Sequence, residues 1–346
     1  MTTNSITDLF QIRLPVIQAP MAGAQDHRLA VAVSVAGGLG SLPCAMLDVE
    51  GVRSEVGHFR GASRGPLNLN FFCHSQPERN PERERAWQEL LAPYFEEFAV
   101  DIAPPDRGAG RQPFSATFAN LVEEIRPEVV SFHFGLPGEE LLAKVRGSGA
   151  RIIATATTVR EALWLEAKGV DAVIAQGAEA GGHRGNFLSD DITRQVGTFA
   201  LLPQVVREVK VPVIAAGGIA GAEGVAAAMK LGAAGVQIGT AYLLCSESTI
   251  SPLHRAALQS EQRQHTAMTN VFTGRPARGI VNRLMRELGP MHSAVPEFPL
   301  AAPLLAALRK RAESEGNSDF SPLWAGQNTD GCRAVSATEL TRDLFS

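Results

Sequence analysis

Short apolar runs, separated by amphipathic segments, dominate the pattern along this chain. The runs are continuously hydrophobic rather than alternating, which is typical of strands buried on both faces of a parallel sheet. Eight of them occur in order, and several end in glycine or a small polar residue. They cover residues 15–20, 38–43, 66–72, 129–134, 151–157, 172–177, 211–218 and 235–241.

Helix signals lie between these runs. Thr158 and Glu161 have the spacing of a capping box and predict a helix that begins there. A helix over 199–209, with its apolar residues on one face, is expected to be capped by Thr198. An alanine-rich helix is expected over 222–231. The chain therefore alternates strands with helices.

Strand starts recur about every 20–25 residues over much of the chain, which is the length of one βα unit. Eight units predict a (β/α)8 TIM barrel, and a doubly wound open sheet is the alternative. Unusual residues fall at the ends of strands that lie far apart in the sequence, namely Met21, Asn70, His133, Gln176 and Gly217–Gly218. All strand ends of a barrel meet at one face, so this distribution favours the barrel.

Two stretches interrupt the rhythm. Residues 73–117 are rich in charge and proline and predict an insertion with a solvated helix and a loop, while helices are expected around 280–287 and 300–314. We therefore expect a TIM barrel with a smaller, mainly helical second domain formed by the insertion and the C-terminal tail. The expected boundaries are 1–73 and 117–263 for the barrel, and 74–116 and 264–346 for the second domain. This domain either covers the barrel mouth, excluding water, or only stabilises the fold.

Composition narrows the function classes. The 346 residues are 45% hydrophobic and 20% charged, with a net charge of −4, as in an ordinary soluble protein. The mild negative charge argues against a nucleic-acid surface, and no apolar run is long enough to span a membrane. The polar N-terminus lacks the pattern of a secretory signal, so a cytoplasmic location is expected. The cysteines show no metal-type spacing, which predicts reduced thiols and no metal site; they are Cys44, Cys73, Cys245 and Cys332.

The loop over 175–185 holds the most informative chemistry. Its glycines allow backbone amides to approach a planar or anionic ligand, and His183 among them can act as an acid or base near neutral pH. Taken alone, Gly-Gly-His favours a simple turn that carries a solvated histidine, and the functional interpretation depends on the rest of the chain. Glu179 and Arg184, close by, are expected to be exposed loop charges.

The loops after the last two runs resemble a phosphate site. Gly217, Gly218 and the segment 237–240 offer backbone amides and the Thr240 hydroxyl, at the place where barrels commonly hold phosphate. Asn70 and Gln176 carry carboxamides, which can donate and accept as the pyrimidine edge of a flavin requires, although such residues also cap strand ends. No GxGxxG follows the first run, which argues against a dinucleotide site.

These residues carry a resemblance to the nitronate monooxygenase family, formerly called 2-nitropropane dioxygenases, and within it to class I. The resemblance runs from about Ile12 to Gln327, and its most specific part is the Gln-Gly-x-Glu-Ala-Gly-Gly-His signature at 176–183. The insertion and the tail from Asn328 onward carry no motif that aligns. The other matching segments are Ala19-Pro20-Met21-Ala22-Gly23, Asn68-Leu69-Asn70-Phe71-Phe72, His133-Phe134-Gly135 and Trp324-Ala325-Gly326-Gln327.

The resemblance implies a flavoprotein with non-covalent FMN that oxidises alkyl nitronates, typically propionate 3-nitronate, with O₂. The products would be a carbonyl compound and nitrite, and the role detoxification. His183 matches the catalytic, substrate-binding histidine, and His133 a second substrate-binding residue. The positions that match FMN contacts are Met21, Ala22, Asn70, Gln176, Gly181, Gly217, Gly218, Gln237, Ile238, Gly239 and Thr240.

Two other functions remain compatible with the residues. An FMN-dependent NAD(P)H:quinone or enoyl-thioester reductase would share the phosphate loops, and a non-catalytic barrel would bind flavin only. The His-Phe-Gly and Trp-Ala-Gly-Gln segments favour the monooxygenase. The expected partners are a small nitronate and O₂, and both a monomer and a homodimer remain open.

Overall fold

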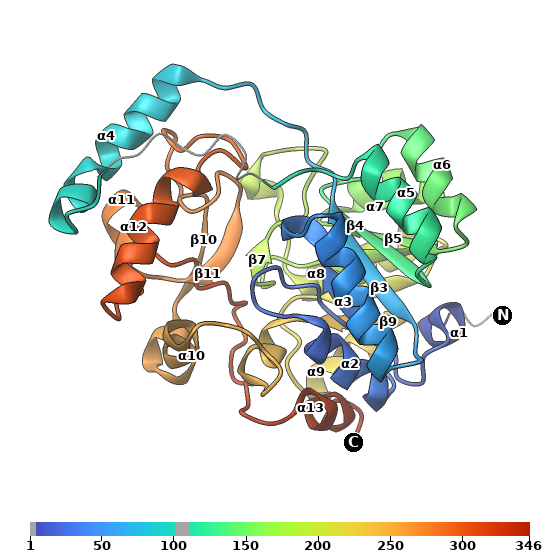
Figure 1. Ribbon diagram of the computed structural model, residues 1–346. Coiled ribbons are helices and arrows are strands. Elements are labelled where there is room, and N and C mark those ends of the chain that lie inside the picture. The colour runs from blue at the N-terminus through green and yellow to red at the C-terminus, as the bar shows by residue number, and fades with distance from the viewer. Residues whose placement is uncertain (1–4, 102–110) are drawn as a thin grey trace.

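The computed structural model describes residues 5–101 and 111–346, and its barrel lies to the right in Figure 1. Eight parallel strands form one sheet in the order β1-β9-β8-β6-β5-β4-β3-β2. Each strand lies within one of the eight apolar runs of the sequence. The strands are β1 (Val16–Gln18), β2 (Gly40–Pro43), β3 (Leu67–Phe72), β4 (Val129–His133), β5 (Arg151–Ala156), β6 (Ala172–Gln176), β8 (Val213–Ala216) and β9 (Gly235–Ile238).

The first and last strands of that order close the sheet into a barrel. The Gln18 backbone N–H donates to the Leu39 carbonyl at 3.0 Å, and the Leu39 N–H donates to the Val16 carbonyl at 2.9 Å. Ile17 and Leu39 form a parallel bridge. The TIM barrel is therefore confirmed, and the open sheet is excluded.

Helices cover the outside of the barrel. Thr158 caps α7 as predicted, since its hydroxyl accepts from the Glu161 N–H at 3.2 Å. The prediction for Thr198 is wrong, because α8 begins at Thr198 itself and Gly197 is its N-cap residue. The helices are α2 (His27–Ala36), α3 (Val49–Ala62), α5 (Ala116–Ile125), α6 (Glu139–Gly147), α7 (Val159–Ala167), α8 (Thr198–Glu208) and α9 (Ala222–Lys230).

The barrel interior is a layer of aliphatic side chains. Ile17, Ile153, Ile174 and Ile214 are buried there from four different strands. The short helix α1 (Ile6–Phe10) adds Ile6 and Phe10 to the same cluster, at the end where the strands begin. The opposite, carboxyl end is therefore the end left for a site.

A second body, which we call the cap, lies beside the barrel mouth (Figure 1). It has its own core, in which Trp87 of α4 and Leu308 of α12 are fully buried. The insertion helix α4 is thus packed on one face rather than simply solvated. The cap also contains a three-stranded antiparallel sheet that the sequence pattern does not predict. Its elements are α4 (Pro81–Glu97), α11 (Arg283–Leu288), α12 (Ala302–Ser314), β10 (Thr266–Thr269), β11 (Ala277–Ile280) and β7 (Gly182–His183).

The last helix, α13 (Ala337–Asp343), lies on the barrel, although the sequence pattern assigns it to the second domain. Leu340 and Leu344 are buried in the main barrel cluster. The Thr338 hydroxyl donates to the Ala32 carbonyl of α2 at 2.9 Å. In Figure 1, α13 lies below α2 and α9. The remaining helices are α10 (Pro252–Gln259) and the 3₁₀ turns η1 (Cys44–Met46), η2 (Ile192–Arg194), η3 (Thr240–Leu244) and η4 (Glu261–Gln264).

Two further expectations concern the cysteines and the membrane. All four cysteines are free thiols. Within the two described ranges, no helix combines the length and apolarity that crossing a bilayer requires.

Candidate active site

A cavity of about 470 Å³ lies at the carboxyl ends of the barrel strands, and we call it the inner cavity. Residues far apart in the sequence line it together. Of the predicted site residues, it is lined by Met21, Ala22, Asn70, His133, Gln176, Gly181, His183, Gly217, Gly218, Gln237, Gly239 and Thr240. Ile238 is the one predicted site residue that does not line this cavity. Side chains alternate along a strand, and the Ile238 side chain is buried in the core outside the barrel sheet.

His183 joins the barrel to the cap. It lies on β7, where it pairs with Ala277 of β11. Its Nε2 is 2.9 Å from the Thr273 hydroxyl, which itself donates to the Arg275 carbonyl at 3.3 Å. Since that hydroxyl has only one proton to give, His183 Nε2 carries a proton and donates it to Thr273. Nδ1 is then the basic nitrogen, and it has no hydrogen-bond partner among the described residues.

The surroundings of His183 keep its ring uncharged. Phe298 and Trp324 lie with ring centroids 5.3 and 5.6 Å from the imidazole. Burial lowers the pKa of His183 well below 6.5, and the nearby cations Arg111 and Arg275 act in the same direction. The imidazole is therefore neutral near pH 7, able to accept one proton and to donate one hydrogen bond.

Gln176 and His133 hold the backbone of His183. The Gln176 amide donates to the His183 carbonyl at 3.1 Å, and its oxygen accepts from the Gly185 N–H at 2.8 Å. His133 Nε2 donates to the same His183 carbonyl at 3.2 Å, and its Nδ1 contacts the Thr155 hydroxyl at 3.1 Å. Burial lowers the pKa of His133 to about 3, so this ring is also neutral. Both of its nitrogens are used within the protein.

The expectation that Arg184 is an exposed loop charge is wrong. Arg184 has no exposed surface. Its guanidinium donates to the Gln176 and Gly177 carbonyls at 2.7 and 2.6 Å and to the Gln195 side chain at 2.8 Å. Burial lowers its pKa to about 9, so it stays protonated at neutral pH. The chain leaves the sheet at this point, and its carbonyls need other donors.

Glu179 is also not an exposed loop charge. Its carboxylate accepts from the Thr198 backbone N–H at 2.8 Å and from the Thr198 hydroxyl at 2.9 Å. These bonds place a negative charge at the N-terminus of α8, where the helix dipole and the free N–H groups favour it. Glu179 therefore ties the loop after β6 to α8.

The expected phosphate loops require glycine. Gly217 and Gly218 have φ of 110° and 74°, in the left-handed region that residues with a Cβ rarely adopt. The segment 324–328 lies against these loops. The Asn328 amide donates to the Gly218 carbonyl, and the Gly326 N–H donates to the Thr240 hydroxyl, both at 2.9 Å. Asn328 thus contributes to the site although it lies where the alignable motifs end.

Polar atoms of the inner cavity fit a planar, nitrogen-rich ligand. Gln237 Oε1 is buried and has no donor among the described residues. Leaving such an oxygen unpaired costs about 1–3 kcal/mol, so a ligand N–H is the natural partner. The Asn70 amide donates to the Ser131 hydroxyl at 2.9 Å, which orients its own oxygen. A flavin, with a pyrimidine edge of donors and acceptors and a phosphate, matches this set.

Three site residues lie outside the set that sequence reasoning identified. Thr273, Phe298 and Arg111 come from the cap or from the chain just after the segment outside the described residues. They meet His183 only through tertiary structure, and no local motif marks them. Trp324 is different, because the Trp-Ala-Gly-Gln segment already pointed to it.

Comparison with known proteins agrees with this geometry. The model of a family described as nitronate monooxygenase matches residues 3–346. The chain is 40% identical to a nitronate monooxygenase of Pseudomonas aeruginosa, over 99% of this chain and 98% of the relative.

Solved structures of two related proteins share this fold. A nitroalkane oxidase from Streptomyces ansochromogenes is 38% identical, with a TM-score of 0.90 over 98% of this chain and 96% of that one. FabK from Thermotoga maritima is 27% identical, with a TM-score of 0.72 over 98% of this chain and 94% of that one. With a full-length family match, curated relatives of that name and the same barrel, the chain belongs to the nitronate monooxygenase family, a family of flavin-dependent oxidoreductases.

Proposed function

We propose that the chain is an FMN-dependent nitronate monooxygenase that converts small alkyl nitronates, propionate 3-nitronate among them, and O₂ into a carbonyl compound and nitrite. The observation that carries the proposal is His183, a neutral imidazole held at the mouth of a barrel beside glycine loops suited to phosphate. Family membership supports it independently.

The residues that would hold FMN divide into two groups. Gly217, Gly218, Gly239 and Thr240 lie at the ends of β8 and β9, where the Thr240 hydroxyl accepts from Gly326 and keeps its own proton for a phosphate oxygen. The ring side is assigned to Met21, Ala22, Asn70, Gln176, Gly181 and Gln237, and Ile238 contributes backbone only. When bound, FMN supplies the electron acceptor that nitronate oxidation requires.

His183 has two tasks in this proposal. A neutral nitroalkane must lose an α-proton, and the basic Nδ1 can accept it. A nitronate arrives already deprotonated and needs a hydrogen-bond donor, which the Nε2 proton can supply in exchange for the Thr273 contact. His133, with both nitrogens engaged, is assigned the task of positioning the His183 backbone rather than bonding the substrate.

The aromatic side chains around His183 exclude water from the substrate. Phe72, Phe134, Phe298 and Trp324 lie with ring centroids 6.2, 6.0, 5.3 and 5.6 Å from the imidazole. A low-polarity wall strengthens each remaining hydrogen bond to the anionic substrate. A cytoplasmic, detoxifying role belongs to the same proposal, and the four free cysteines are consistent with a reducing compartment.

An NAD(P)H-dependent reductase is the second candidate, because the FabK structure shares this architecture. The two functions differ in the reductant. Anaerobic mixing of the yellow protein with propionate 3-nitronate should bleach the flavin absorbance within seconds, whereas NADH should leave it unchanged over minutes. Bleaching by NADH alone would favour the reductase.

A further inference from the structure

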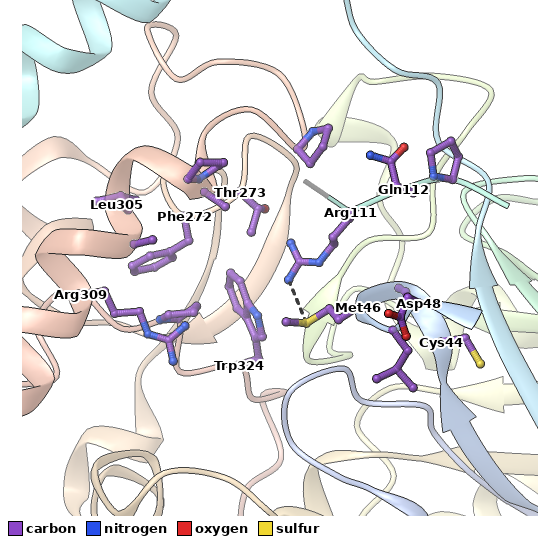
Figure 2. Close-up of a pocket in the computed structure, with 18 of the residues that line it drawn as sticks. Cys44, Met46, Asp48, Arg111, Gln112, Phe272, Thr273, Leu305, Arg309 and Trp324 are labelled. Carbon is purple, nitrogen blue, oxygen red and sulfur yellow. Dashed lines mark hydrogen bonds between the residues drawn. The ribbon is translucent and has the colours of Figure 1, made fainter. Parts of the chain in front are cut away.

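A second cavity of about 1020 Å³ adjoins the inner cavity on the side of the cap, and we call it the outer groove. Figure 2 shows Phe272, Leu305 and Trp324 on one side of it and Met46 with Asp48 on the other. Five residues line both spaces and so mark the junction between them, namely Met46, Arg111, Arg309, Pro322 and Trp324. A substrate bound at His183 would extend through this junction.

Arg111, at the junction, has no carboxylate partner within residues 5–101 and 111–346. Its Nη2 contacts the Met46 sulfur at 3.9 Å, and its guanidinium lies 5.7 Å from the Phe298 ring centre. Its Nε is buried without a hydrogen-bond partner among the described residues. Burial and the neighbouring cation Arg309 both lower the pKa of Arg111, and no carboxylate in the described part of the chain opposes them. A half-buried cation whose Nε is buried and unpaired is costly unless a ligand supplies the counter-charge.

The acids that line the outer groove are already occupied. The Asp48 carboxylate accepts from the Gly51 N–H at 2.8 Å and caps α3. Glu313 accepts from Arg309 Nε and from the Ser321 hydroxyl, both at 2.6 Å. Neither acid is paired with Arg111 within the described ranges, so a bound ligand is the source of counter-charge that we consider.

Other cations near the site are less suited to bind that anion. Arg309 is exposed and paired with Glu313. Lys310 is exposed on α12, in contact with solvent. Arg275 lies 4.1 Å from the Phe134 ring centre and donates to the Asn186 carbonyl. Arg309 and Arg111 both line the junction, but of the two only Arg111 lacks a carboxylate partner among the described residues.

We propose that Arg111 is the recognition site for a second anionic group on the substrate, a carboxylate carried a few carbons from the nitronate. The nitronate lies at His183, the carboxylate accepts hydrogen bonds from the guanidinium, and the remaining chain faces the apolar wall of the outer groove. Arginine suits this task because its planar N–H groups match the two oxygens of a carboxylate. The position of the nitronate at His183 rests on the proposed function. The role of Arg111 in binding a carboxylate does not.

Matched substrates test the proposal. The wild-type enzyme is assayed with the nitronates of 3-nitropropionate and 4-nitrobutyrate and with those of 1-nitropropane and 1-nitrobutane. The expected KM is about 10- to 100-fold lower for the carboxylated member of each pair, as a charged hydrogen bond in a dry site allows. Arg111→Gln should abolish this difference by raising the KM of the carboxylated substrates, with kcat within about two-fold. Arg111→Lys should restore part of it.

A control variant separates a specific site from general charge. Arg311 lies two residues after Arg309 on α12, is exposed and pairs with Glu315, so Arg311→Gln removes the same charge away from both cavities. It should leave the KM ratio unchanged. The proposal would be overturned if Arg111→Gln and Arg311→Gln reduced the KM difference between the paired substrates equally. It would also be overturned if Arg309→Gln reduced that difference and Arg111→Gln did not.

A binding measurement keeps this test independent of turnover. Succinate has two carboxylates and butyrate has one, and neither is oxidised. Calorimetric titration of the flavin-loaded protein should show succinate binding at least ten-fold more tightly than butyrate, and Arg111→Gln should remove that preference. If no nitronate is oxidised, the proposed function fails while this titration still decides the role of Arg111. Equal binding of the two acids by the wild-type protein would overturn the proposal.

Discussion

At the scale of single residues, the proposed chemistry depends on the protonation of His183. Burial comes first and four neighbouring groups follow in keeping its pKa below the ordinary value of 6.5, namely Arg111, His133, Arg275 and His74. Thr273 fixes one nitrogen as the donor, so the other is available as a base. The catalytic assignment therefore predicts different behaviour for substrates that need a base and substrates that do not.

Replacing His183 by asparagine should separate these two substrate forms. Turnover of neutral nitroalkanes, where measurable in the wild type, should fall by about 10² to 10⁴, the usual effect of losing a general base. Turnover of nitronates should fall less, and FMN content should stay near native. His58→Asn, an exposed histidine on α3, is the matched control. Equal losses on both forms would make His183 an orienting group, and full activity on both would remove it from the mechanism.

The pH dependence follows from the same residue. An ordinary imidazole gains a proton near pH 6.5. A base with a lowered pKa is still unprotonated at that pH and gains its proton only when the pH falls further. The kcat/KM for a neutral nitroalkane should therefore stay level between about pH 8 and 6.5 and fall only at lower pH. A titration centred near 6.5 in the initial rates would show that the imidazole is solvated, contrary to the structure.

At the scale of elements, the loops after β6, β8 and β9 form one unit with the segment 324–328. Gly218 takes a φ of 74°, whereas Gly221, three residues later, has an extended φ of −158° and open space where a Cβ would lie. The two glycines lie in the same loop and differ in their need to be glycine.

This difference gives a paired prediction. Gly218→Val should distort the loop and yield mostly colourless protein, because the amides no longer approach a phosphate. Gly221→Ala should purify with native FMN content. Absorbance at the flavin band relative to protein absorbance measures both. A fully yellow Gly218→Val with native affinity for FMN would contradict the phosphate assignment.

The sequence pattern predicts some elements well and others not at all, for physical reasons. The eight strands are buried on both faces, so burial itself appears in the sequence as continuous apolar runs. Strand β7 has two residues and pairs with β11, which lies more than ninety positions away, so no periodicity marks it. Arg184 is misassigned because its partners are chiefly backbone carbonyls, which every residue has. Arg111 shows no signal because its neighbours come from the barrel and the cap together.

At the scale of the whole molecule, several histidines are buried in the uncharged form. Burial lowers the pKa of His133 to about 3 and the pKa values of His74 and His254 to about 4. The unfolded chain binds protons at these sites near pH 6.5, while the folded chain does not. The stability that these three histidines contribute is therefore fully present above pH 6.5 and is lost as the pH falls towards 4.

Thermal unfolding at constant ionic strength should show this directly. We predict a level Tm between about pH 8 and 7 and a steep fall between about pH 6 and 4, to which His133 alone contributes about 2–3 kcal/mol. His133→Gln should have a lower Tm at neutral pH and a shallower acid slope. A Tm that stays constant from pH 7 to 5 would mean that the imidazoles are accessible to protons in the folded state.

We infer that this barrel uses a nitronate, and not a nicotinamide, as its reductant and O₂ as its second substrate. Oxygen uptake by the purified yellow protein with propionate 3-nitronate tests it most directly, with nitrite measured in the same sample. We predict O₂ consumption that needs no NADH, nitrite released with it, and no return of O₂ when catalase is added. No O₂ uptake with the nitronate, together with rapid oxidation of NADH, would contradict the claim.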